Sequence, residues 1–460
     1  MLTRFTIQVP PPMATSGLII GLDKPPVIWS HHKTRIGGVV LDGEKTAQAP
    51  NATDLRKPAK EPRAPGLSPR LTLLLAAACG LAVGNVYNAQ PLLETIATGL
   101  GIPLGNVGII GTITQVGYGF GLVFIVPLGD MLSRRSLALW QFTLSAAALL
   151  VAGFAGTRTL FLVATGMVGL LAVVVQVLVA LAASLAAPEQ RGRALGLVTS
   201  GVVTGILTAR VLAGFIADVA GWRAVYFTSA GAMVAMAALL FRSLPQQPKK
   251  TAPITYAGLL RSMAKVLWQD RDLHLRAGFA FLIFATFSSL WTAVALPLGR
   301  EPFMLSHAQV GLLGLAGVVG ALAAGGAGRL ADRGLGTTVT GLALGLMLLS
   351  WLLLAMLPIS LAWLVGGVVL LDLAVQAVHV TNQSLLMSQR PEAAGRLIGL
   401  YMVFYSLGSA SGAIASTAAY AQAGWLGVCS LGAALSSGAV LLWILTSRRR
   451  HAHEVEVLPH

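Results

Sequence analysis

One pattern of residues occurs twice in this chain, and it constrains the fold more than any other feature. The second copy follows the first at an offset of 203 residues, as three pairs show: Pro188 and Pro391, Gly205 and Gly408, Trp222 and Trp425. Asp130 and Asp332, each just after an earlier apolar segment, match to within one residue of this offset. The chain therefore contains two copies of one unit, and two such units can rock about a site held between them, as in alternating-access transporters.

The composition places both units in a membrane. Charged residues make up 11% of the chain and hydrophobic residues 55%, whereas a soluble domain carries roughly 25% charged residues. The two cysteines, Cys79 and Cys429, fall in apolar segments far apart, which excludes a disulfide framework and favours simple packing roles. The sequence contains no P-loop, no paired catalytic carboxylates and no metal-ligand spacing. We therefore expect neither an enzyme nor an ATP-driven pump, and no cofactor or metal ion.

Twelve segments have the ~20 apolar residues that a membrane-crossing helix needs. The predicted fold is an all-α membrane protein, with twelve transmembrane helices in two pseudo-symmetric six-helix bundles. The polar tail 1–68 is expected to be a disordered cytoplasmic segment or an over-extended translation start. The remaining predicted boundaries are a first bundle at 69–241, a linker at 242–276, a second bundle at 277–446 and a tail at 447–460.

Basic residues are distributed unequally between the two sides of the predicted bundle. With a cytoplasmic N-terminus, 28 of the 32 Lys and Arg lie in cytoplasmic segments. Because positive charge is retained on the cytoplasmic side of membranes, both termini and the linker are predicted to be cytoplasmic. The net charge of +15 is then a sign of topology and of contact with an anionic bilayer, and nucleic acid is not an expected partner.

The loop after the second predicted helix, Gly129-Asp130-Met131-Leu132-Ser133-Arg134-Arg135, resembles the signature loop of the major facilitator superfamily. A degenerate copy, Gly328 to Arg333, lies where that family has its second loop. The resemblance implies that Asp130 and Asp332 approach the N-termini of helices 11 and 5, where a carboxylate meets unpaired N–H groups. The residues expected to gate the cytoplasmic side are Gly129, Asp130, Arg134, Arg135, Asp332, Arg333, Arg193 and Arg396.

The segments 87–93 and 372–384 resemble a bacterial inner-membrane branch of this family with poorly assigned substrates, often grouped with drug and sugar exporters. Drug–proton antiporters of the family often carry a Gly-Pro pair on helix 5. Here Gly205 is followed by Ile206, which weakens the case for antiport.

A polar stripe on the tenth predicted helix gives the strongest candidates for a substrate or proton pathway. Asp372, Gln376, His379 and Gln383 are spaced by four, three and four residues and share one helical face. Ionisable groups within a bilayer are costly and usually face a cavity or a partner. Either Asp372 or His379 is therefore a candidate proton carrier, and the alternative is a structural hydrogen bond between helices.

Arg210 lies well inside the fifth predicted helix. Its head group is expected to turn inward to meet Asp372, a substrate anion or each in turn, and the alternative is snorkelling toward the surface. Further candidates share faces of other helices, where they serve either binding or helix packing. They are Asn85, Asn88, Gln115, Tyr118, Gln176, Tyr401 and Tyr405.

These features together predict a secondary transporter in the bacterial inner membrane that exports a small organic solute, coupled to protons and functional as a monomer. An importer or facilitator with the same fold is the nearest alternative. A transporter-derived ligand sensor is an alternative of another class.

Overall fold

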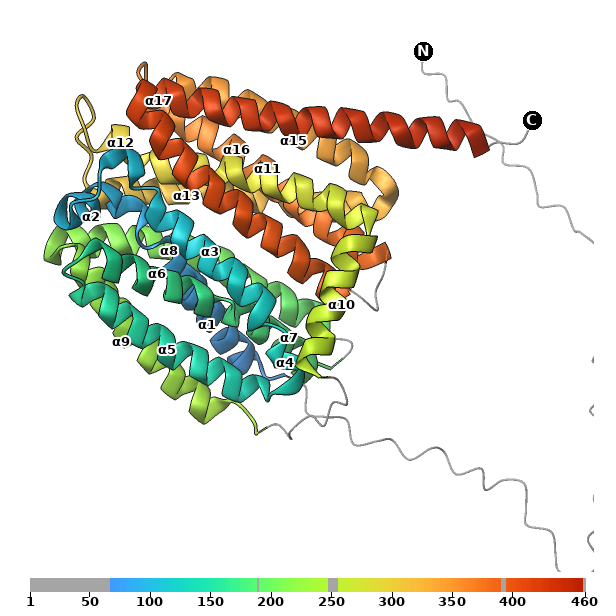
Figure 1. Ribbon diagram of the computed structural model, residues 1–460, viewed down its shortest axis with the longest axis horizontal. Helices are drawn as coiled ribbons and strands as arrows, with labels where there is room; N and C mark the ends of the chain where they lie inside the picture. Colours follow the sequence, from blue (N-terminus) through green and yellow to red (C-terminus); the bar gives the residue numbers. More distant parts are fainter. Residues whose placement is uncertain (1–66, 188–189, 247–254, 390–393, 458–460) are drawn as a thin grey trace, which may run out of the picture. The chain divides into compact units, whose positions relative to one another are not determined.

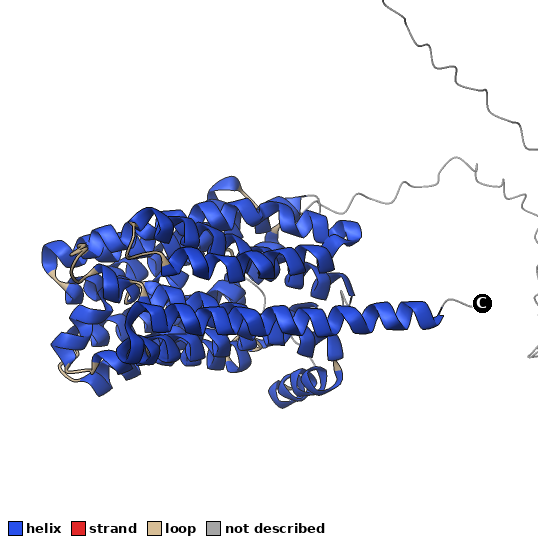
Figure 2. Ribbon diagram, turned by 90° about the horizontal axis from the view of Figure 1, so that it is seen from above, coloured by secondary structure: helices blue, strands red, loops and turns tan. Residues whose placement is uncertain are grey.

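The computed structural model describes residues 67–187, 190–246, 255–389 and 394–457. Within these ranges every regular element is helical, and most helices run side by side along one direction (Figures 1 and 2). The predicted tail lies outside the described residues up to position 66, so its disorder remains a prediction. The all-α fold is confirmed.

The first half of the bundle begins with α1 at Pro69, one residue after Ser68, whose side chain caps the helix by accepting the N–H of Leu71. Six membrane-length stretches follow one another, several of them broken by short turns. Their elements are α1 (Pro69–Tyr87), η1 (Gln90–Leu92), α2 (Leu93–Leu100), η2 (Leu104–Asn106), α3 (Ile109–Phe124), α4 (Leu128–Met131), α5 (Arg134–Phe154), α6 (Arg158–Ala172), α7 (Val174–Leu185), α8 (Arg191–Ala220) and α9 (Trp222–Ser243).

The second half follows α10 (Tyr256–Gln269), a helix that forms within the predicted linker 242–276. Its elements are α11 (Arg271–Ala293), α12 (Ala295–Leu298), α13 (His307–Ala323), η4 (Ala324–Gly326), α14 (Ala327–Leu330), η5 (Ala331–Leu335), α15 (Gly336–Ala355), α16 (Leu361–Gln389) and α17 (Ala394–Val457). Helix α17 thus continues beyond residue 447, where a tail was expected to begin.

Among the described residues, eleven helical stretches are long and apolar enough to cross a membrane. The last, Gly395–Ser447, has 53 residues and leaves helical geometry at Ala423 and Gly424. Since ~20 residues suffice for one crossing, this stretch supplies two. The total of twelve crossings agrees with the sequence, and the chain is a multi-pass membrane protein.

The repeated Gly-Trp pair forms the same corner in both halves. Gly221 has φ +80° between α8 and α9, and Gly424 has φ +61° at the bend of α17. Residues that carry a side chain rarely adopt such positive φ angles, so glycine is required at both corners. The tryptophan that follows secures each corner, since Trp222 is buried and Trp425 donates its indole N–H to the Leu354 carbonyl at 2.8 Å.

The repeated glycines Gly205 and Gly408 allow helices to pack closely within each half. A Cβ on Gly205 would lie 2.2 Å from the Cα of Gly80 on α1, and one on Gly408 would lie 2.2 Å from the Phe281 carbonyl oxygen on α11. Small residues at such crossings are what membrane helices use to approach one another.

The two halves meet along two pairs of helices, with α8 packed on α13 and α3 packed on α17. Helices α2 and α12 lie at one end of the bundle, called here the latch end, and α4 and α10 lie at the other, called the motif end (Figure 1). A site between the halves is therefore bordered by α1, α8, α11, α13 and α16.

Candidate functional site

Arg210 and Asp372 contact the same aromatic ring, Trp291, with Arg210 over its face and Asp372 at its N–H edge. The guanidinium carbon of Arg210 on α8 is 3.8 Å from the centroid of the Trp291 ring on α11. The Trp291 Nε1–H donates to Asp372 Oδ1 on α16 at 3.1 Å. All three side chains are at most 5% exposed. Arg210 and Asp372 are thus linked through the indole of Trp291, and the predicted meeting of the two side chains remains a prediction.

The guanidinium of Arg210 is only partly satisfied by its neighbours. Its Nε–H donates to Gln90 Oε1 at 2.9 Å, and the rings of Tyr87 and Phe287 lie 5.3 and 6.0 Å away. Its Nη2 is buried and has no hydrogen-bond partner among the described residues. Because an unpaired buried donor on a charged group is costly, this nitrogen is suited to receive an oxygen atom of a solute or of water.

Four glycines spaced three residues apart on α13 allow these charged groups to come close. Gly311 and Gly314 face Arg210, and Gly317 and Gly320 face α16. A Cβ on Gly317 would lie 2.2 Å from Asp372 Oδ2, whereas one on Gly314 would make ordinary contacts at 3.6 Å or more. Helix α13 is thus a thin spacer between the arginine of one half and the aspartate of the other.

We expect Gly317→Ala to lower transport at least tenfold, because the methyl group forces the Asp372 carboxylate away from Trp291. Gly314→Ala is the matched control, and it should retain near-normal transport. Both changes add ~1 kcal/mol of helix propensity, so thermal unfolding of the purified variants separates a local effect from a folding defect. Equal rates for the two variants would show that the position of Asp372 is unimportant.

The remainder of the predicted helix 10 stripe contacts a different neighbour. His379 is hydrogen-bonded at Nδ1 to the Tyr401 hydroxyl at 3.0 Å and at Nε2 to the Gln383 amide at 3.2 Å. Tyr405 joins the halves, since its hydroxyl lies 2.8 Å from that of Tyr87. The stripe therefore divides, with Asp372 near Arg210 and His379 in an aromatic cluster with α17. Gln376 is partly buried between them along the chain.

The predicted residues of helices 2 and 4 border this aromatic cluster. Gln176 donates to the Tyr118 hydroxyl at 3.5 Å, and the Tyr118 and Tyr405 rings are 6.3 Å apart. Gln115 lies with Gln90 beside a void of about 20 Å³, which is room for about one water molecule. The centre of the bundle is therefore closed around its polar groups in this conformation.

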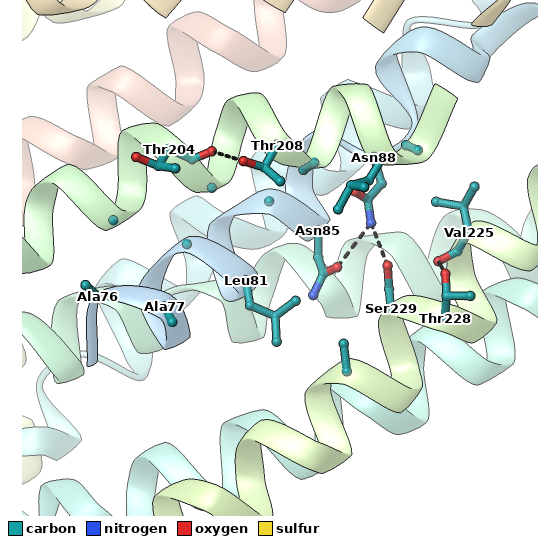
Figure 3. Close-up of a pocket in the computed structure, with 18 of the residues that line it drawn as sticks. Ala76, Ala77, Leu81, Asn85, Asn88, Thr204, Thr208, Val225, Thr228 and Ser229 are labelled. Atoms are coloured by element: carbon teal, nitrogen blue, oxygen red, sulfur yellow. Dashed lines mark hydrogen bonds between the residues drawn. The ribbon is translucent and has the colours of Figure 1, made fainter. Parts of the chain in front are cut away.

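Asn85 and Asn88 are placed elsewhere. The Asn88 amide donates to Asn85 Oδ1 at 3.1 Å and to the Ser229 hydroxyl at 3.0 Å on α9. Both line a groove between α1, α8 and α9 rather than the central cluster (Figure 3).

The latch end holds a contact between a carboxylate and a helix N-terminus. Asp218, near the end of α8, accepts the backbone N–H of His307 at 3.2 Å and of Ala308 at 2.9 Å, where α13 begins. It also accepts from His307 Nδ1 at 2.7 Å, while His307 Nε2 is 2.7 Å from the Thr95 hydroxyl. This arrangement matches the favourable position for a negative charge at a helix start, and it joins the two halves.

A second ion pair at the latch end joins Glu94 and Arg300 at 2.9 Å. The hydrogen bond with Glu94 raises the pKa of Arg300 above its usual value. Both side chains are more than a third exposed, and such a pair contributes only ~0–1 kcal/mol. Asp218 is therefore the stronger part of this latch.

At the motif end, the predicted gate residues make local contacts. Asp130 is 3.8 Å from Arg134 of the same loop, and Arg134 and Arg135 donate to the carbonyls of Ala180 and Phe241. Gly129 is buried, whereas Arg193, Arg333 and Arg396 are exposed. Asp332 belongs to η5, and its side chain lies outside the described residues. The gating role of this group remains a prediction.

Several residues of the site were missed in the sequence. Trp291 and Phe287 look like ordinary apolar residues of membrane helices, and no spacing distinguishes them. Gln90 lies within the segment 87–93, which resembles a bacterial branch of the family. That resemblance was the one sign in the sequence that Gln90 belongs to the site. Asp218 and His307 lie at predicted helix ends on the side with few charges, where an acid and a histidine are unusual.

The sequence and the fold both resemble known transporters. A family model described as Major Facilitator Superfamily matches residues 73–413 and, in a second match, 277–458. The transporter YgaY of Escherichia coli is 42% identical over 386 residues, which cover 84% of this chain and 98% of YgaY. The chloramphenicol resistance protein of Streptomyces lividans is 29% identical over 71% of this chain and 83% of its own. The crystal structure of the nucleoside transporter NupG has a TM-score of 0.66 at 15% identity, covering 82% of this chain and 99% of that one.

Proposed function

The chain belongs to the Major Facilitator Superfamily, and from this premise we propose that it exports a small organic solute by proton-coupled alternating access. The observation that carries the proposal is the cluster of Arg210, Trp291 and Asp372, because it contains opposite charges from the two halves in the middle of the bundle. Ionisable groups at this depth are typical of substrate and proton pathways. Asp372 is the proposed proton carrier, and the free Nη2 of Arg210 is the proposed contact to the solute.

Export is favoured over import by the likeness to a chloramphenicol resistance protein. The bacterial inner membrane and a cytoplasmic motif end remain part of the proposal, because they follow from the distribution of Lys and Arg and from family resemblance. Import is the second candidate, since Ile206 replaces the proline that drug–proton antiporters often carry.

The proposal is tested with purified protein in proteoliposomes that enclose a pH-sensitive dye. A panel of neutral, anionic and cationic organic solutes is offered under an imposed pH gradient, and solute and proton movements are measured together. Proton-coupled movement of at least one solute supports the proposal, and its direction relative to the gradient separates export from import. Solute binding without any flux would instead indicate a ligand sensor.

Substitutions at the latch end and at the motif end should open the centre of the bundle to opposite sides of the membrane. We expect Asp218→Ala to raise labelling of a Thr292→Cys reporter from the latch end at least threefold, because it removes three accepted hydrogen bonds. Thr292 is 2% exposed and the native cysteines would first be replaced by alanine.

Asp130→Asn should instead increase access from the motif end and strongly reduce transport.

Glu301→Gln, which changes an exposed acid at the latch end, is the control for this experiment. Labelling of Thr292→Cys that is the same in Asp218→Ala and in Glu301→Gln would show that Asp218 does not hold the halves together. Normal labelling and normal flux in Asp130→Asn would make Asp130 a plain loop residue.

A further inference from the structure

A groove of about 600 Å³ lies between α1, α8 and α9, apart from the central cluster. Its volume is within the ~300–1,000 Å³ typical of small-molecule sites. It opens on the flank of the first half, where its edge residues Leu73, Leu197 and Leu212 are exposed. In a chain that spans the membrane, this flank is reached from the bilayer.

The groove is uncharged and changes character along its length. Along α1 the lining is apolar at Ala76 and Ala77 and polar at Asn85 and Asn88, which lie near Ser229 of α9 (Figure 3). Asn88 follows Leu73 by fifteen positions, which corresponds to roughly 22 Å along the helix axis. The groove is therefore longer than the ~15 Å thickness of one hydrocarbon leaflet. A groove of this length accommodates an elongated molecule.

Much of the polar lining is not required by the fold, because the second half lacks it at most of the equivalent positions. At the offset of 203 residues, four polar side chains of the groove are replaced by apolar side chains or by glycine: Ser200 by Val403, Thr204 by Leu407, Thr228 by Leu431 and Ser229 by Gly432. Two stay polar, since Thr208 corresponds to Ser411 and Asn85 to Ser288. The two halves share their corners and their glycine contacts, so the difference is specific to the groove.

Asn85 offers a hydrogen bond that no residue in the described part of the chain accepts. Its side chain is only 7% exposed, and its Oδ1 is occupied by the Asn88 amide. Its Nδ2 has no partner among the described residues, and it points away from Asn88 (Figure 3). Leu81 lies beside it in the groove (Figure 3). An acceptor brought by a ligand would relieve the cost of this unpaired donor.

We propose that this groove binds an uncharged, elongated lipophile from the bilayer, whose carbonyl oxygen accepts a hydrogen bond from Asn85. A charged ligand is disfavoured because none of the lining side chains offers a countercharge. A fully apolar chain would leave the Asn85 donor unpaired. An acyl ester satisfies both requirements, because it is uncharged and its carbonyl oxygen accepts a hydrogen bond. Its carbonyl would lie at the polar end, with the acyl chain toward Leu73.

The test uses three photoreactive probes with the same diazirine-bearing chain in proteoliposomes of the full-length protein. They are a monoacylglycerol, the corresponding fatty acid anion and an alkane, and the adducts are located by mass spectrometry. We expect the monoacylglycerol to label α1, α8 and α9 at least fivefold more than either other probe. Equal labelling by all three, or labelling spread evenly over the outer helices, would overturn the proposal.

Two variants and one matched control complete the experiment. Thr204→Trp fills the groove and should reduce labelling at least tenfold, whereas Leu407→Trp, at the equivalent exposed position of the second half, should leave it unchanged. Asn85→Leu keeps the size of the side chain and should reduce labelling by the monoacylglycerol threefold to tenfold. Thermal unfolding verifies that each variant is folded. Undiminished labelling in folded Asn85→Leu would exclude the proposed hydrogen bond, whatever solute the protein transports.

Discussion

Replacing Arg210 by lysine is expected to lower transport at least tenfold, almost as much as replacing it by alanine. The guanidinium stacks on Trp291 while its Nε–H donates to Gln90, and an ammonium cannot do both in the same place. A buried cation–π contact contributes ~2 kcal/mol and a hydrogen bond from a charged group ~1.5–3 kcal/mol. Loss of either contact is sufficient for a tenfold lower rate, since ~1.4 kcal/mol corresponds to a factor of ~10 in rate.

Arg223 supplies a matched control for this experiment. It also stacks on a tryptophan, with its guanidinium carbon 4.2 Å from the ring centroid of Trp222, and it donates to the Ala155 carbonyl. Because Arg223 lies at the start of α9 and away from the central cluster, Arg223→Lys should retain transport. Initial rates and half-saturating concentrations are measured for both variants with the solute found in the panel. An Arg210→Lys protein with normal affinity and rate would remove Arg210 from the site.

Replacing Asp372 by asparagine is expected to abolish accumulation of the solute against its gradient while leaving binding within a few-fold of normal. Asparagine has nearly the same size and keeps an oxygen that accepts the Trp291 N–H, which is 3.1 Å from Asp372 Oδ1. The variant therefore loses the charge and the exchangeable proton but little of the packing.

Counterflow and gradient-driven transport, compared in the same proteoliposomes, measure this separation. Counterflow requires only binding and reorientation, so it should persist in Asp372→Asn, whereas gradient-driven movement should vanish. If gradient-driven movement persists as well, another group carries the proton. His379 would then be the next residue to test, because it lies in the aromatic cluster between α16 and α17.

The sequence predicted the architecture well because membrane helices are identified by the length and apolarity of their segments and by the repeat of the pattern. Twelve crossings and two halves agree with the structure. The main differences are breaks within helices. In the first span, for example, the chain turns after Tyr87 and continues through α2 to Leu100. Such turns within apolar segments are set by tertiary packing, which the local sequence does not reveal.

The site was only partly predictable, for a related reason. Periodicity correctly placed Asp372 and His379 on one face of a helix, yet that face borders two neighbours and the residues belong to different clusters. Asn85 and Asn88 share a face that lines the lateral groove. A helical period tells which residues lie together on a helix, whereas the identity of the opposing helix depends on the complete bundle. Trp291 was missed because nothing in the sequence distinguishes a bridging tryptophan from a packing one.

The placement of Trp291 between two opposite charges has an electrical consequence. With Asp372 ionised, the cluster has no net charge, so reorientation of the empty protein moves little charge through the membrane potential. Protonation of Asp372 leaves the positive charge of Arg210 unbalanced, and moving one elementary charge across 100 mV changes the free energy by up to ~2.3 kcal/mol. If Asp372 carries the proton as proposed, the voltage across the membrane acts mainly on the proton-loaded form. The direction in which that form reorients then depends on the polarity of the cell.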